Sequence, residues 1–589
     1  MKTKMKKENK KTVAGKKIKE KIIITSALPY VNNVPHLGNL VCVISADVYS
    51  RYLKLAGKNA IYVLGTDEHG TTAEIKALEE GITPKQLVDK YFKIHENIYK
   101  WFECEADCFG RTSSNENKKI TEEIFKALDK NGFIKEDEIE QLYCPKCKIF
   151  LSDRYTEGIC PKCKYEKARG DQCDKCGTLL DPKELINPKC KICGSKPLIK
   201  KTKHLFLDLP KLQPEIEKWA ENEKINWTEN AITMTNAWLK EGLKIRDISR
   251  DLKWGIKIPK KGYENKVFYS WFDAPIGYIG ITAENKKDWE KWWKVPETTE
   301  LIQFMGKDNI PFHTILFPSY LIGTKEKWTM PTKISVNEYL NYETGKFSKS
   351  RSEGVFGDDA ISTGIKPDVW RYYLMRQRPE KSDITFTWED FQEKINKELV
   401  ANIGNLIHRT LFFINKYFNS EIPVSSKKIK FDEINEIIES AKRSFEKIEI
   451  RKAVKYILEL SQKGNQYFQS EEPWANIEKN RKKAENAIAN LAKIIKDISI
   501  LIYPIMPEAG KKIQETLGLK NISLNELGKE LKKGQKIKES KPVFEKFEDD
   551  KLKELKEKFK GKNEKTKDCL LYTSPSPRDR TRSRMPSSA

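Results

Sequence analysis

Residues 22–39 have the sequence IIITSALPYVNNVPHLGN, and they decide the fold. The β-branched run 22–24 predicts a buried strand, and the apolar side chains that follow the loop recur with helical spacing. The helix begins near His36 and Asn39, where free N–H groups suit an anion, and Gly38 lets a ligand approach closely. Alone, this pattern fits a nucleotide-phosphate site and an ordinary strand–helix junction equally well.

Length and charge limit the classes that fit. A chain of 589 residues predicts three or four domains, and its net charge of +24 favours a polyanionic partner or a lysine-rich solvated surface. No run of 18 apolar residues occurs, and the lysine-rich start lacks the apolar core of a secretory signal. We therefore expect a cytoplasmic protein without a membrane span, with a disordered basic arm over residues 1–20.

A second strand is predicted over residues 60–64, and the polar residues Asp67, Glu68 and His69 follow its end. Polar groups at the carboxyl end of a strand lie over the crevice of a parallel sheet. A carboxylate there can bind an ammonium group, and it can equally cap the helix that follows. Further helices are predicted over 84–103 and 116–131.

Eight of the twelve cysteines form four Cys-x-x-Cys pairs within 50 residues. Each pair can present two thiolates to one tetrahedral ion, so two structural zinc ions are expected. Disulfides are disfavoured by the predicted compartment, and iron–sulfur ligation is a weaker alternative. Spacing alone leaves the pairing open. The expected ligands are Cys144, Cys147, Cys160, Cys163, Cys173, Cys176, Cys190 and Cys193.

The middle of the chain resumes with a strand-like segment and helices over 204–241, and then a strand is predicted within 263–283 that ends in the aromatic turn 271–278. Trp and Tyr around a Pro-Gly turn indicate either plain core or the wall of an apolar ligand pocket. The next strand, LIQFMG, ends at Gly306, and the helix after it carries His313.

One more strand is predicted over 333–340, ahead of the loop Lys346-Phe347-Ser348-Lys349-Ser350. Lysines beside hydroxyls can embrace a triphosphate and neutralise the charge of leaving pyrophosphate. An exposed basic loop without function is the plainer interpretation of the same residues.

Together, HLGN at 36–39 and KFSKS at 346–350 resemble the two signatures of class I aminoacyl-tRNA synthetases, His-Ile-Gly-His and Lys-Met-Ser-Lys-Ser. Phe347 replaces the usual Met, and Asn39 replaces the final His of the commonest form. Within this class the chain resembles the methionyl-tRNA synthetase family over about 21–545. The motifs that carry this resemblance are ALPY at 27–30, GTDEHG at 65–70, WFDAPIGY at 271–278, GKD at 306–308 with His313, and the four cysteine pairs.

The resemblance implies an α/β fold, with a split, doubly wound, Rossmann-like parallel sheet, a zinc-knuckle insertion and an all-α anticodon-binding bundle. The expected division is a basic arm (1–20), the first half of the catalytic domain (21–113), the connective insertion (114–234), the second catalytic half (235–337), the KFSKS loop with a stem-contact segment (338–390), the helical anticodon-binding domain (391–545), and a charged helix with a disordered or non-native tail (546–589).

The resemblance also implies the reaction and the site. Methionine is activated by ATP to methionyl-adenylate and then transferred to the 3′ end of tRNA(Met), with Mg²⁺ bound to ATP. The catalytic residues would be His36, Asn39, Lys346 and Lys349; the ATP-binding residues His36, Gly38, Asn39, Gly306, Asp308 and Lys349; the methionine-binding residues Ala27, Leu28, Tyr30, Asp67, Trp271, Pro275, Tyr278 and His313; and a further active-site candidate Arg250. Members of this family that bind a single ion keep the two inner cysteine pairs. The resemblance therefore implies one group of Cys160, Cys163, Cys173 and Cys176 and an outer group of Cys144, Cys147, Cys190 and Cys193.

Residues 391–545 carry long amphipathic helices, which predict a bundle. The resemblance gives Asn405, Arg409 and Trp474 as residues that read the anticodon. An exposed Trp can stack on an unpaired base, and it can equally pack at a helix start after Pro473. Residues 569–589 change to a Ser-, Pro- and Arg-rich composition, which indicates a frameshift or foreign sequence.

Two alternatives remain at this point. The first is a zinc-containing nucleic-acid-binding protein without catalysis, which would need neither signature. The second is a class I synthetase for leucine, isoleucine or valine, although those usually carry a larger editing insertion. The sequence leaves open whether the protein is a monomer or a homodimer.

Overall fold

The structure, a computed structural model, describes residues 12–13, 16–17, 19–151, 155–170, 173, 176, 180–343, 345, 347–349, 352–424, 432–520 and 522–561. Lys346, Ser350 and the tail beyond 561 lie outside the described residues, as does most of the predicted basic arm. Two short strands of that arm, β1 (Thr12–Val13) and β2 (Lys16–Lys17), pair antiparallel.

A five-stranded parallel sheet forms the centre of the catalytic part, which confirms the predicted doubly wound fold. The strand order is β16-β15-β3-β4-β5. The opening stretch supplies the middle strand, and the order along the sheet changes direction there. The bounds are β3 (Lys21–Ser26), β4 (Asn59–Thr66), β5 (Cys108–Arg111), β15 (Thr299–Gly306) and β16 (Pro331–Asn337).

Helices cover both faces of this sheet, and the side chains of each strand alternate between the two layers. Ile22 and Ile24 pack in the core beneath α2 (Leu37–Leu55), whereas Ile23 packs in the core beneath α5 (Asn115–Lys130) and α8 (Ser270–Asn285). All three isoleucines are buried. The run of β-branched residues in the opening stretch therefore fills two cores, as a central parallel strand requires.

The prediction of a strand that ends in the turn 271–278 is wrong. Only β14 (Val267–Phe268) is extended, and residues 270–285 form the helix α8. Pro275 lies inside this helix and has no N–H to donate to the carbonyl of Trp271. The Tyr320 hydroxyl donates to that carbonyl instead, at 3.1 Å. A tertiary hydrogen bond thus replaces the lost helical one, and the prediction from Pro and Gly could not include it.

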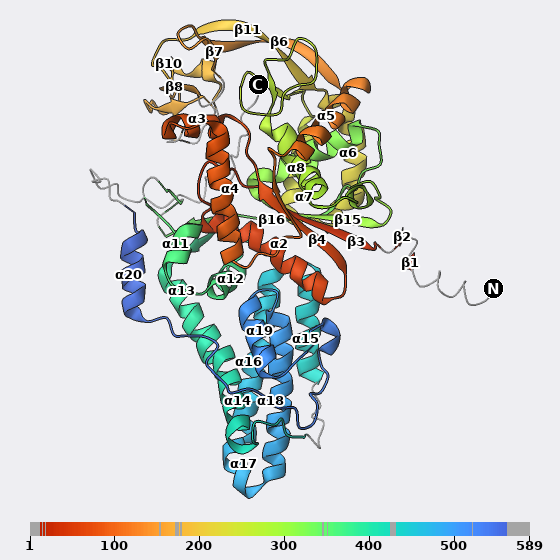
Figure 1. The fold of residues 1–589 in the computed structure, drawn as a ribbon, viewed down its shortest axis with the longest axis vertical. Helices are drawn as coiled ribbons and strands as arrows, with labels where there is room; N and C mark the ends of the chain where they lie inside the picture. Colours follow the sequence, from red (N-terminus) through yellow and green to blue (C-terminus); the bar gives the residue numbers. More distant parts are fainter. Residues whose placement is uncertain are drawn as a thin grey trace, which may run out of the picture.

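The segment between β5 and β15 carries the cysteine region on a long antiparallel ribbon of β6 (Ile134–Cys144) and β11 (Leu198–Leu207), which Figure 1 shows at the top of the molecule. Its smaller strands are β7 (Ile149–Phe150), β8 (Thr156–Ile159), β9 (Ala168–Arg169), β10 (Ile186–Cys190), β12 (Arg246–Asp247) and β13 (Ser249–Arg250). The short 3₁₀ helix Pro182–Glu184 precedes β10.

The other elements of the catalytic part complete its layers and edges. They are α3 (Thr71–Glu80), α4 (Pro84–Trp101), α6 (Leu209–Glu223), α7 (Glu229–Glu241), α9 (Glu290–Trp293), α10 (Phe317–Gly323), α11 (Gly357–Ser362), α12 (Pro367–Arg376), α13 (Trp388–Lys394), β17 (Leu340–Tyr342), β18 (Ile384–Phe386), the 3₁₀ helices Lys224–Asn226 and Lys307–Asn309, and the π-helix Phe312–Leu316. The predicted helix after Gly306 therefore forms, and it begins with a 3₁₀ turn and a π turn.

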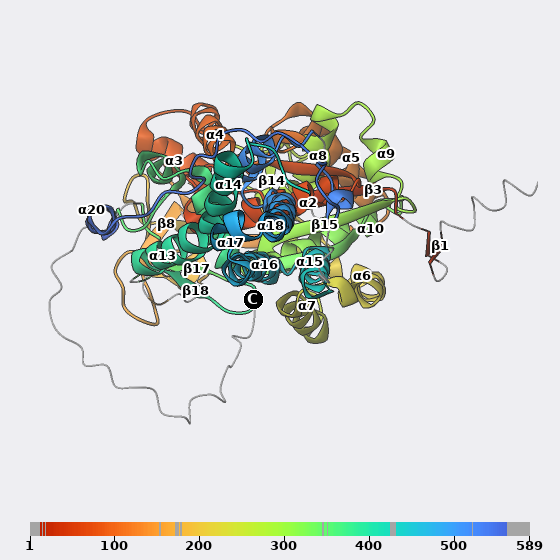
Figure 2. The ribbon, with the colours of Figure 1, turned by 90° about the horizontal axis from the view of Figure 1, so that it is seen from below.

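The predicted helical bundle forms the lower half of the molecule in Figure 1, and Figure 2 shows its helices end-on beneath the sheet. Its elements are the π-helix Ile395–Gly404, α14 (Asn405–Tyr417), α15 (Asp432–Glu446), α16 (Ile450–Glu471), α17 (Pro473–Lys479), α18 (Arg481–Ile502), α19 (Pro507–Thr516) and the 3₁₀ turn Leu524–Glu526. Within the described part of the chain, every helix is too short or too polar to cross a bilayer.

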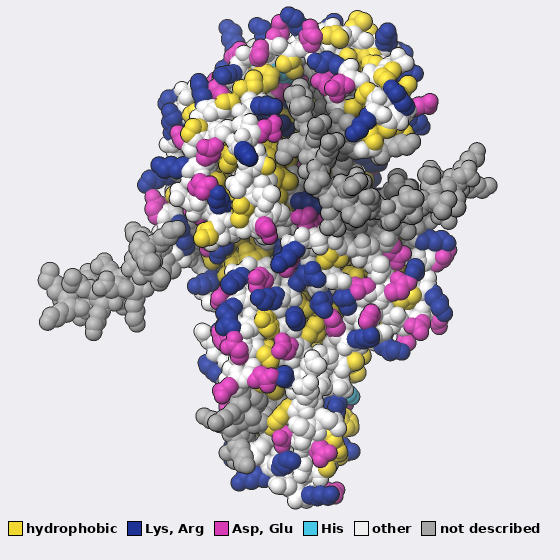
Figure 3. Space-filling view, turned by 180° about the vertical axis from the view of Figure 1, so that it is seen from behind, with side chains coloured by type: hydrophobic (Ala, Val, Ile, Leu, Met, Phe, Trp, Pro, Cys, Tyr) yellow, Lys and Arg dark blue, Asp and Glu magenta, His cyan; other side chains and the backbone are white. Residues whose placement is uncertain are grey.

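The charged helix α20 (Asp549–Phe559) packs back on the chain itself. Phe559 is buried and stacks on Trp388 of α13, with ring centroids 6.0 Å apart. The apolar side of α20 is therefore buried against other parts of this chain. On the face drawn in Figure 3, Lys and Arg side chains are spread among Asp and Glu over the catalytic part and the bundle.

Candidate active site

The two short signatures meet in space although they lie far apart in the sequence. His36 caps the start of α2 and pairs through its backbone with Phe356 in an isolated β-bridge. The ring of Phe347 lies parallel to the imidazole of His36, with centroids 4.6 Å apart and planes 2° apart. The residue that departs from the usual signature therefore makes the contact that joins the two motifs.

The first turn of α2 leaves room for a ligand to approach its backbone closely. The side chain of Asn39 accepts the backbone N–H of His36 at 3.1 Å, which closes the first turn. A Cβ on Gly38 would lie 2.9 Å from the imidazole of His36, so no larger residue fits there without moving the ring. Burial lowers the pKa of His36 to about 4, and its Nδ1 is buried without a partner. A neutral imidazole with an unused nitrogen thus faces the helix start.

Lys349 is held by carboxylates on the same loop region. Its Nζ lies 2.9 Å from Asp358 and 3.3 Å from Asp359, and it lies over the ring of Phe356 at 4.6 Å. The ammonium group must leave these carboxylates to reach a phosphate. Lys346, the other predicted lysine, lies outside the described residues.

A pocket at the carboxyl ends of β3 and β4 brings together all eight residues that were expected to bind methionine. Eleven residues line it in total, and Ala274, Asn309 and Phe312 were missed by the sequence prediction. Each missed residue lies beside a predicted one in sequence or one helical turn away, which was the only available signal. The predicted members are Ala27, Leu28, Tyr30, Asp67, Trp271, Pro275, Tyr278 and His313.

Asp67 is the one carboxylate among the residues that line this pocket, and it is only 4% exposed. Its Oδ1 is buried and has no hydrogen-bond partner. Burial first, and the neighbouring carboxyl of Asp273 second, raise the pKa of Asp67 well above its ordinary value. Asp273 is itself held by His69, with 2.8 Å between Oδ2 and Nδ1. The pocket therefore lacks the positive charge that would match Asp67.

The opposite wall is aromatic and neutral. The hydroxyl of Tyr278 lies 2.8 Å from Nε2 of His313, whose Nδ1 lies 2.8 Å from the carbonyl of Asn309. A carbonyl only accepts, so Nδ1 carries the proton and Nε2 accepts from Tyr278. Burial lowers the pKa of His313 to about 4, which keeps this imidazole neutral. An uncharged, polarisable group fits such a wall.

Trp271 closes the mouth of the pocket. Its indole N–H donates to the hydroxyl of Tyr30, and its ring meets Phe312 edge-on with centroids 3.8 Å apart. Arg250 lies behind this wall, because its guanidinium stacks over Tyr269 at 3.9 Å and Tyr269 in turn contacts Trp271. Arg250 therefore supports the wall and does not line the pocket.

Gly306 ends β15 and Asp308 lies in the 3₁₀ turn that follows, at the same edge of the sheet as the pocket. The hydroxyl of Tyr339 donates to the carboxylate of Asp308. The intervening Lys307 pairs with Glu338 at 2.8 Å and Asp383 at 2.7 Å, which fixes the turn. This leaves Asp308 as an oriented acceptor beside the helix start.

The cysteines form two separate groups of four thiols, each with all sulfurs within 4.8 Å of one another. The Sγ–Sγ distances are 3.4 Å for Cys144–Cys193, 3.9 Å for Cys147–Cys190, 3.8 Å for Cys160–Cys176 and 3.5 Å for Cys163–Cys173. A tetrahedral ion with metal–sulfur bonds of about 2.3 Å needs sulfurs about 3.8 Å apart, so both groups fit one ion each. The described cysteines are all free thiols in this structure.

Two of the three predicted anticodon residues, Arg409 and Trp474, form one small cluster with Phe468 in the bundle. The guanidinium of Arg409 lies over Phe468 at 4.1 Å and over Trp474 at 5.8 Å. The rings of Phe468 and Trp474 stack with centroids 5.6 Å apart, and Trp474 is 42% exposed. Asn405, one helical turn before Arg409, donates to Asn465 at 3.1 Å. The exposed indole is thus pre-positioned by a cation and a second ring.

A parallel sheet whose carboxyl edge joins an HLGN helix start to a KFSKS loop defines a class I aminoacyl-tRNA synthetase. The family model "tRNA synthetases class I (M)" matches residues 22–411, and the model "Anticodon binding domain of methionyl tRNA ligase" matches residues 422–564. The chain belongs to the methionine–tRNA ligase family, whose members are ATP-dependent aminoacyl-tRNA ligases.

Similar proteins agree with this assignment. The chain is 50% identical to the methionine–tRNA ligase of Borrelia garinii subsp. bavariensis over 553 residues, which is 92% of this chain and 75% of that protein. It is 49% identical to a probable cytoplasmic methionine–tRNA ligase of Dictyostelium discoideum over 559 residues, 92% of this chain and 75% of that one. The non-catalytic alternative and the other apolar amino acids are therefore not retained.

The fold has solved counterparts. A structure of Mycobacterium tuberculosis methionyl-tRNA synthetase in complex with methionyl-adenylate superimposes with a TM-score of 0.75 at 20% identity, covering 89% of this chain and 99% of that chain. The free state of that enzyme gives a TM-score of 0.70 at 19% identity, covering 90% and 99%.

Proposed function

We propose that the pocket around Asp67 binds methionine and that the edge formed by HLGN and KFSKS binds ATP for its activation. The observation that carries this proposal is the single buried carboxylate with an unpartnered oxygen inside an otherwise neutral, aromatic pocket. An α-ammonium group supplies the missing charge, and the Tyr278–His313 wall accepts an uncharged thioether.

In the first step, a carboxylate oxygen of methionine attacks the α-phosphorus of ATP, and pyrophosphate leaves. His36 and Asn39 at the start of α2 steady the phosphates, and Gly38, which has no side chain, lets them approach the positive end of the helix. Lys349 exchanges Asp358 and Asp359 for the departing pyrophosphate, with Lys346 beside it in sequence. Mg²⁺ bound to ATP offsets the remaining charge. This chemistry needs positioning and charge stabilisation, without a covalent side-chain intermediate.

Asp308 and Gly306 supply the adenosine side of the ATP site, where the carboxylate held by Tyr339 accepts from the ribose. In the second step, a ribose hydroxyl at the 3′ end of tRNA(Met) attacks the methionyl carbonyl, and AMP leaves. Arg250 does not contact the substrate in this proposal. It positions the pocket wall, because it holds Tyr269 against Trp271.

The two cysteine groups hold one Zn²⁺ each in this proposal. Four thiolates would complete a tetrahedral shell and leave no position for substrate, so the ions would stabilise the segment that joins β6 to β11. Trp474, with Asn405 and Arg409, reads the anticodon by stacking on an unpaired base.

Charging of tRNA tests this function. The full chain is incubated with ATP, Mg²⁺, radiolabelled methionine and tRNA transcripts that carry CAU or another anticodon. We expect acid-precipitable methionine on the CAU transcript. Equal charging of both transcripts would contradict the role of the Trp474 cluster, and charging of neither would contradict the proposed function.

A further inference from the structure

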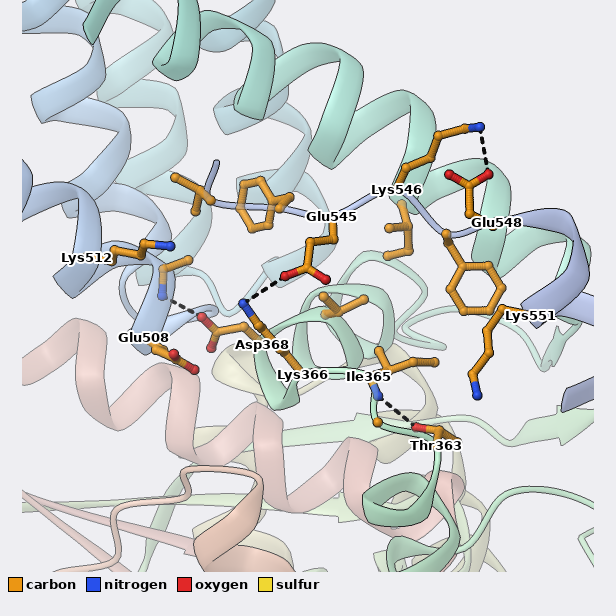
Figure 4. A pocket seen from close by; sticks show the side chains of 17 residues that line it. Thr363, Ile365, Lys366, Asp368, Glu508, Lys512, Glu545, Lys546, Glu548 and Lys551 are labelled. Carbon is orange, nitrogen blue, oxygen red and sulfur yellow. Dashed lines mark hydrogen bonds and ion pairs between the residues drawn. The ribbon is translucent and has the colours of Figure 1, made fainter. Parts of the chain in front are cut away.

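A second pocket lies far from the methionine pocket, where the catalytic part meets the bundle. Four segments form it: residues 363–369 before and within α12, Ile395 at the start of the π-helix, the start of α19, and residues 543–551 ahead of and within α20. Figure 4 shows these segments converging on one hollow, which has about 980 Å³ of space including its open mouth. None of the residues assigned to the reaction lines it.

Seven of the seventeen residues that line this pocket are apolar. Phe544 and Phe547, both buried, contribute to them from the connecting segment. The apolar lining residues are Ile365, Val369, Ile395, Ala509, Val543, Phe544 and Phe547. A wall of this composition accepts a hydrophobic body of a small molecule.

The four lysines on its rim are already partnered. Lys366 pairs with Glu545 at 3.5 Å and Lys546 with Glu548 at 2.9 Å. Lys512 donates to the carbonyl of Pro542 at 3.1 Å, and Lys551 pairs with Glu554 at 3.1 Å. Because each ammonium group has an acceptor, the rim does not offer a site for an anion.

Asp368 lines this pocket and has one carboxylate oxygen without a hydrogen-bond partner. It is 4% exposed, its Oδ2 accepts the backbone N–H of Ala509 at 2.6 Å, and its Oδ1 is buried without a partner. Figure 4 shows its carboxylate beside the side chain of Glu508 at one end of the hollow. A buried acceptor without a donor is costly, and two neighbouring carboxylates favour a cation as the missing donor.

The pKa of Asp368 agrees with this geometry. Burial first, with the carboxylates of Glu103 and Glu508, raises this pKa to about 7, although the N–H of Ala509 and the guanidinium of Arg371 act to lower it. A bound ammonium group would favour the ionised form of the carboxyl, as Arg371 already does in part.

We propose that this junction pocket binds a small amphiphilic amine, with its ammonium group on Asp368 and its apolar body against Val369, Ile365 and the two phenylalanines. Such a ligand would touch α12 of the catalytic part and α19 of the bundle at once. The site is independent of the methionine pocket, so the proposal does not depend on the roles proposed there.

Ligand-observed saturation-transfer NMR on the full chain tests the proposal with 2-phenylethylamine as the probe. The matched probes 2-phenylethanol and phenylacetate share its apolar body and replace the ammonium group by a hydroxyl or a carboxylate. We expect the amine to bind more tightly than the alcohol, and phenylacetate to bind most weakly.

Three variants locate the binding. Asp368→Asn keeps an acceptor for the Ala509 N–H and removes the charge, so the amine should bind about tenfold more weakly or worse. Val369→Phe fills the apolar wall without touching the carboxylate and should abolish binding of all three probes. All titrations contain saturating methionine, which occupies the proposed pocket of Asp67, and Asp67→Asn should then leave the affinity of the amine unchanged.

The opposite patterns overturn the proposal. Binding that survives both Asp368→Asn and Val369→Phe, or that is lost in Asp67→Asn, places the amine elsewhere. Preference for phenylacetate would show that the rim lysines decide the ligand. The rate of methionine-dependent ATP–pyrophosphate exchange verifies that each junction variant is folded; if Asp368→Asn fails this check, Val369→Phe with the three probes decides alone.

Discussion

At the scale of single residues, Asp67 is the group through which the proposed methionine pocket would discriminate by charge. In the empty pocket its pKa is raised by burial and by Asp273, so the carboxyl holds a proton at higher pH than an ordinary aspartate. An ammonium ligand needs the ionised form and lowers the pKa in the complex. If methionine binds Asp67 as proposed, its binding releases a proton at pH values between these two pKa values.

This linkage predicts a pH dependence of the KM for methionine. The KM should be constant above the raised pKa of Asp67 and should rise about tenfold per pH unit below it. Steady-state pyrophosphate exchange over the pH range in which the enzyme stays folded measures this. Asp67→Asn should raise the KM about 100-fold, a loss of roughly 2–3 kcal/mol, and abolish this dependence. A wild-type KM that falls as the pH is lowered would contradict the role of Asp67.

Phe347 shows how a departure from a family motif is accommodated. Its ring packs against His36 and over Gly354, where even a Cβ would clash with it at 2.4 Å. Met is also apolar and can follow the same surface. We expect Phe347→Met to change kcat by less than about threefold, and Phe347→Ala to lower it about tenfold through the lost stacking, on the order of 1.4 kcal/mol.

Stopped-flow measurement of adenylate formation compares the two Phe347 variants. Equal rates for Met and Ala at this position would mean that the stack with His36 does not position the imidazole.

At the scale of elements, periodicity explains most of what could be predicted. Strand β3 and helix α2 follow directly from β-branched residues and from helical spacing after His36. Helix α8 was mistaken for a strand and turn because Pro275 and the glycines signal a break, and the compensating hydrogen bond comes from Tyr320 on the distant helix α10. Tertiary partners of this kind leave no local pattern.

The candidate site was predictable where a motif carried it. All eight predicted pocket residues line one hollow, whereas Phe312 and Asn309 were missed because their place depends on the 3₁₀ and π turns that open the helix. The junction pocket at Asp368 was not predictable either, since its walls come from segments that no motif links.

The two groups of four cysteines predict two zinc ions that can be removed independently of each other. The structure holds two groups of four thiols, so the purified protein should contain two Zn²⁺ per chain. Cys190→Ser removes one ligand of the outer group and should lower the content to one, and Cys173→Ser should do the same for the inner group. Elemental analysis by mass spectrometry after gel filtration measures this.

The matched control is Cys42→Ser, which should keep two ions because Cys42 lies buried in the catalytic core, away from both groups. A loss of both ions in either Cys190→Ser or Cys173→Ser would contradict two independent sites. A full complement in Cys190→Ser would show that this thiol is not a ligand.

At the scale of the whole molecule, one buried arginine joins the two halves. Arg371 of α12 donates to Asp47 of α2 at 2.7 Å and to the carbonyls of Pro504 and Ile505 at 2.9 and 2.7 Å. It also donates to the carbonyl of Phe102 at 2.9 Å. A fully buried guanidinium with these partners fixes the bundle against the helix that begins after His36.

The distance between the Trp474 cluster and the sheet predicts that tRNA recognition and amino-acid activation can be impaired separately. Trp474 lies on α17 at the far end of the bundle from the sheet. Trp474→Ala should therefore raise the KM for tRNA about tenfold, the loss of one stacked base of roughly 1–3 kcal/mol, and leave pyrophosphate exchange unchanged. The control is Phe412→Ala, an exposed aromatic on α14 that lies outside the Arg409 cluster.

Aminoacylation kinetics with a CAU transcript measure both variants. An equal effect of Trp474→Ala and Phe412→Ala would indicate general loss of an apolar surface, and a fall in exchange with Trp474→Ala would contradict the independence of the two ends.

The most direct measurement is ATP–pyrophosphate exchange on the full chain, with methionine, leucine, isoleucine, valine and homocysteine compared in parallel, in the wild type and in Asp67→Asn. The account predicts that methionine gives the highest kcat/KM in the wild type and that Asp67→Asn lowers it about 100-fold, because the buried carboxylate then no longer pairs with the ammonium group. Exchange that is as fast with leucine as with methionine, or that is unaffected by Asp67→Asn, would contradict the assignment of this pocket.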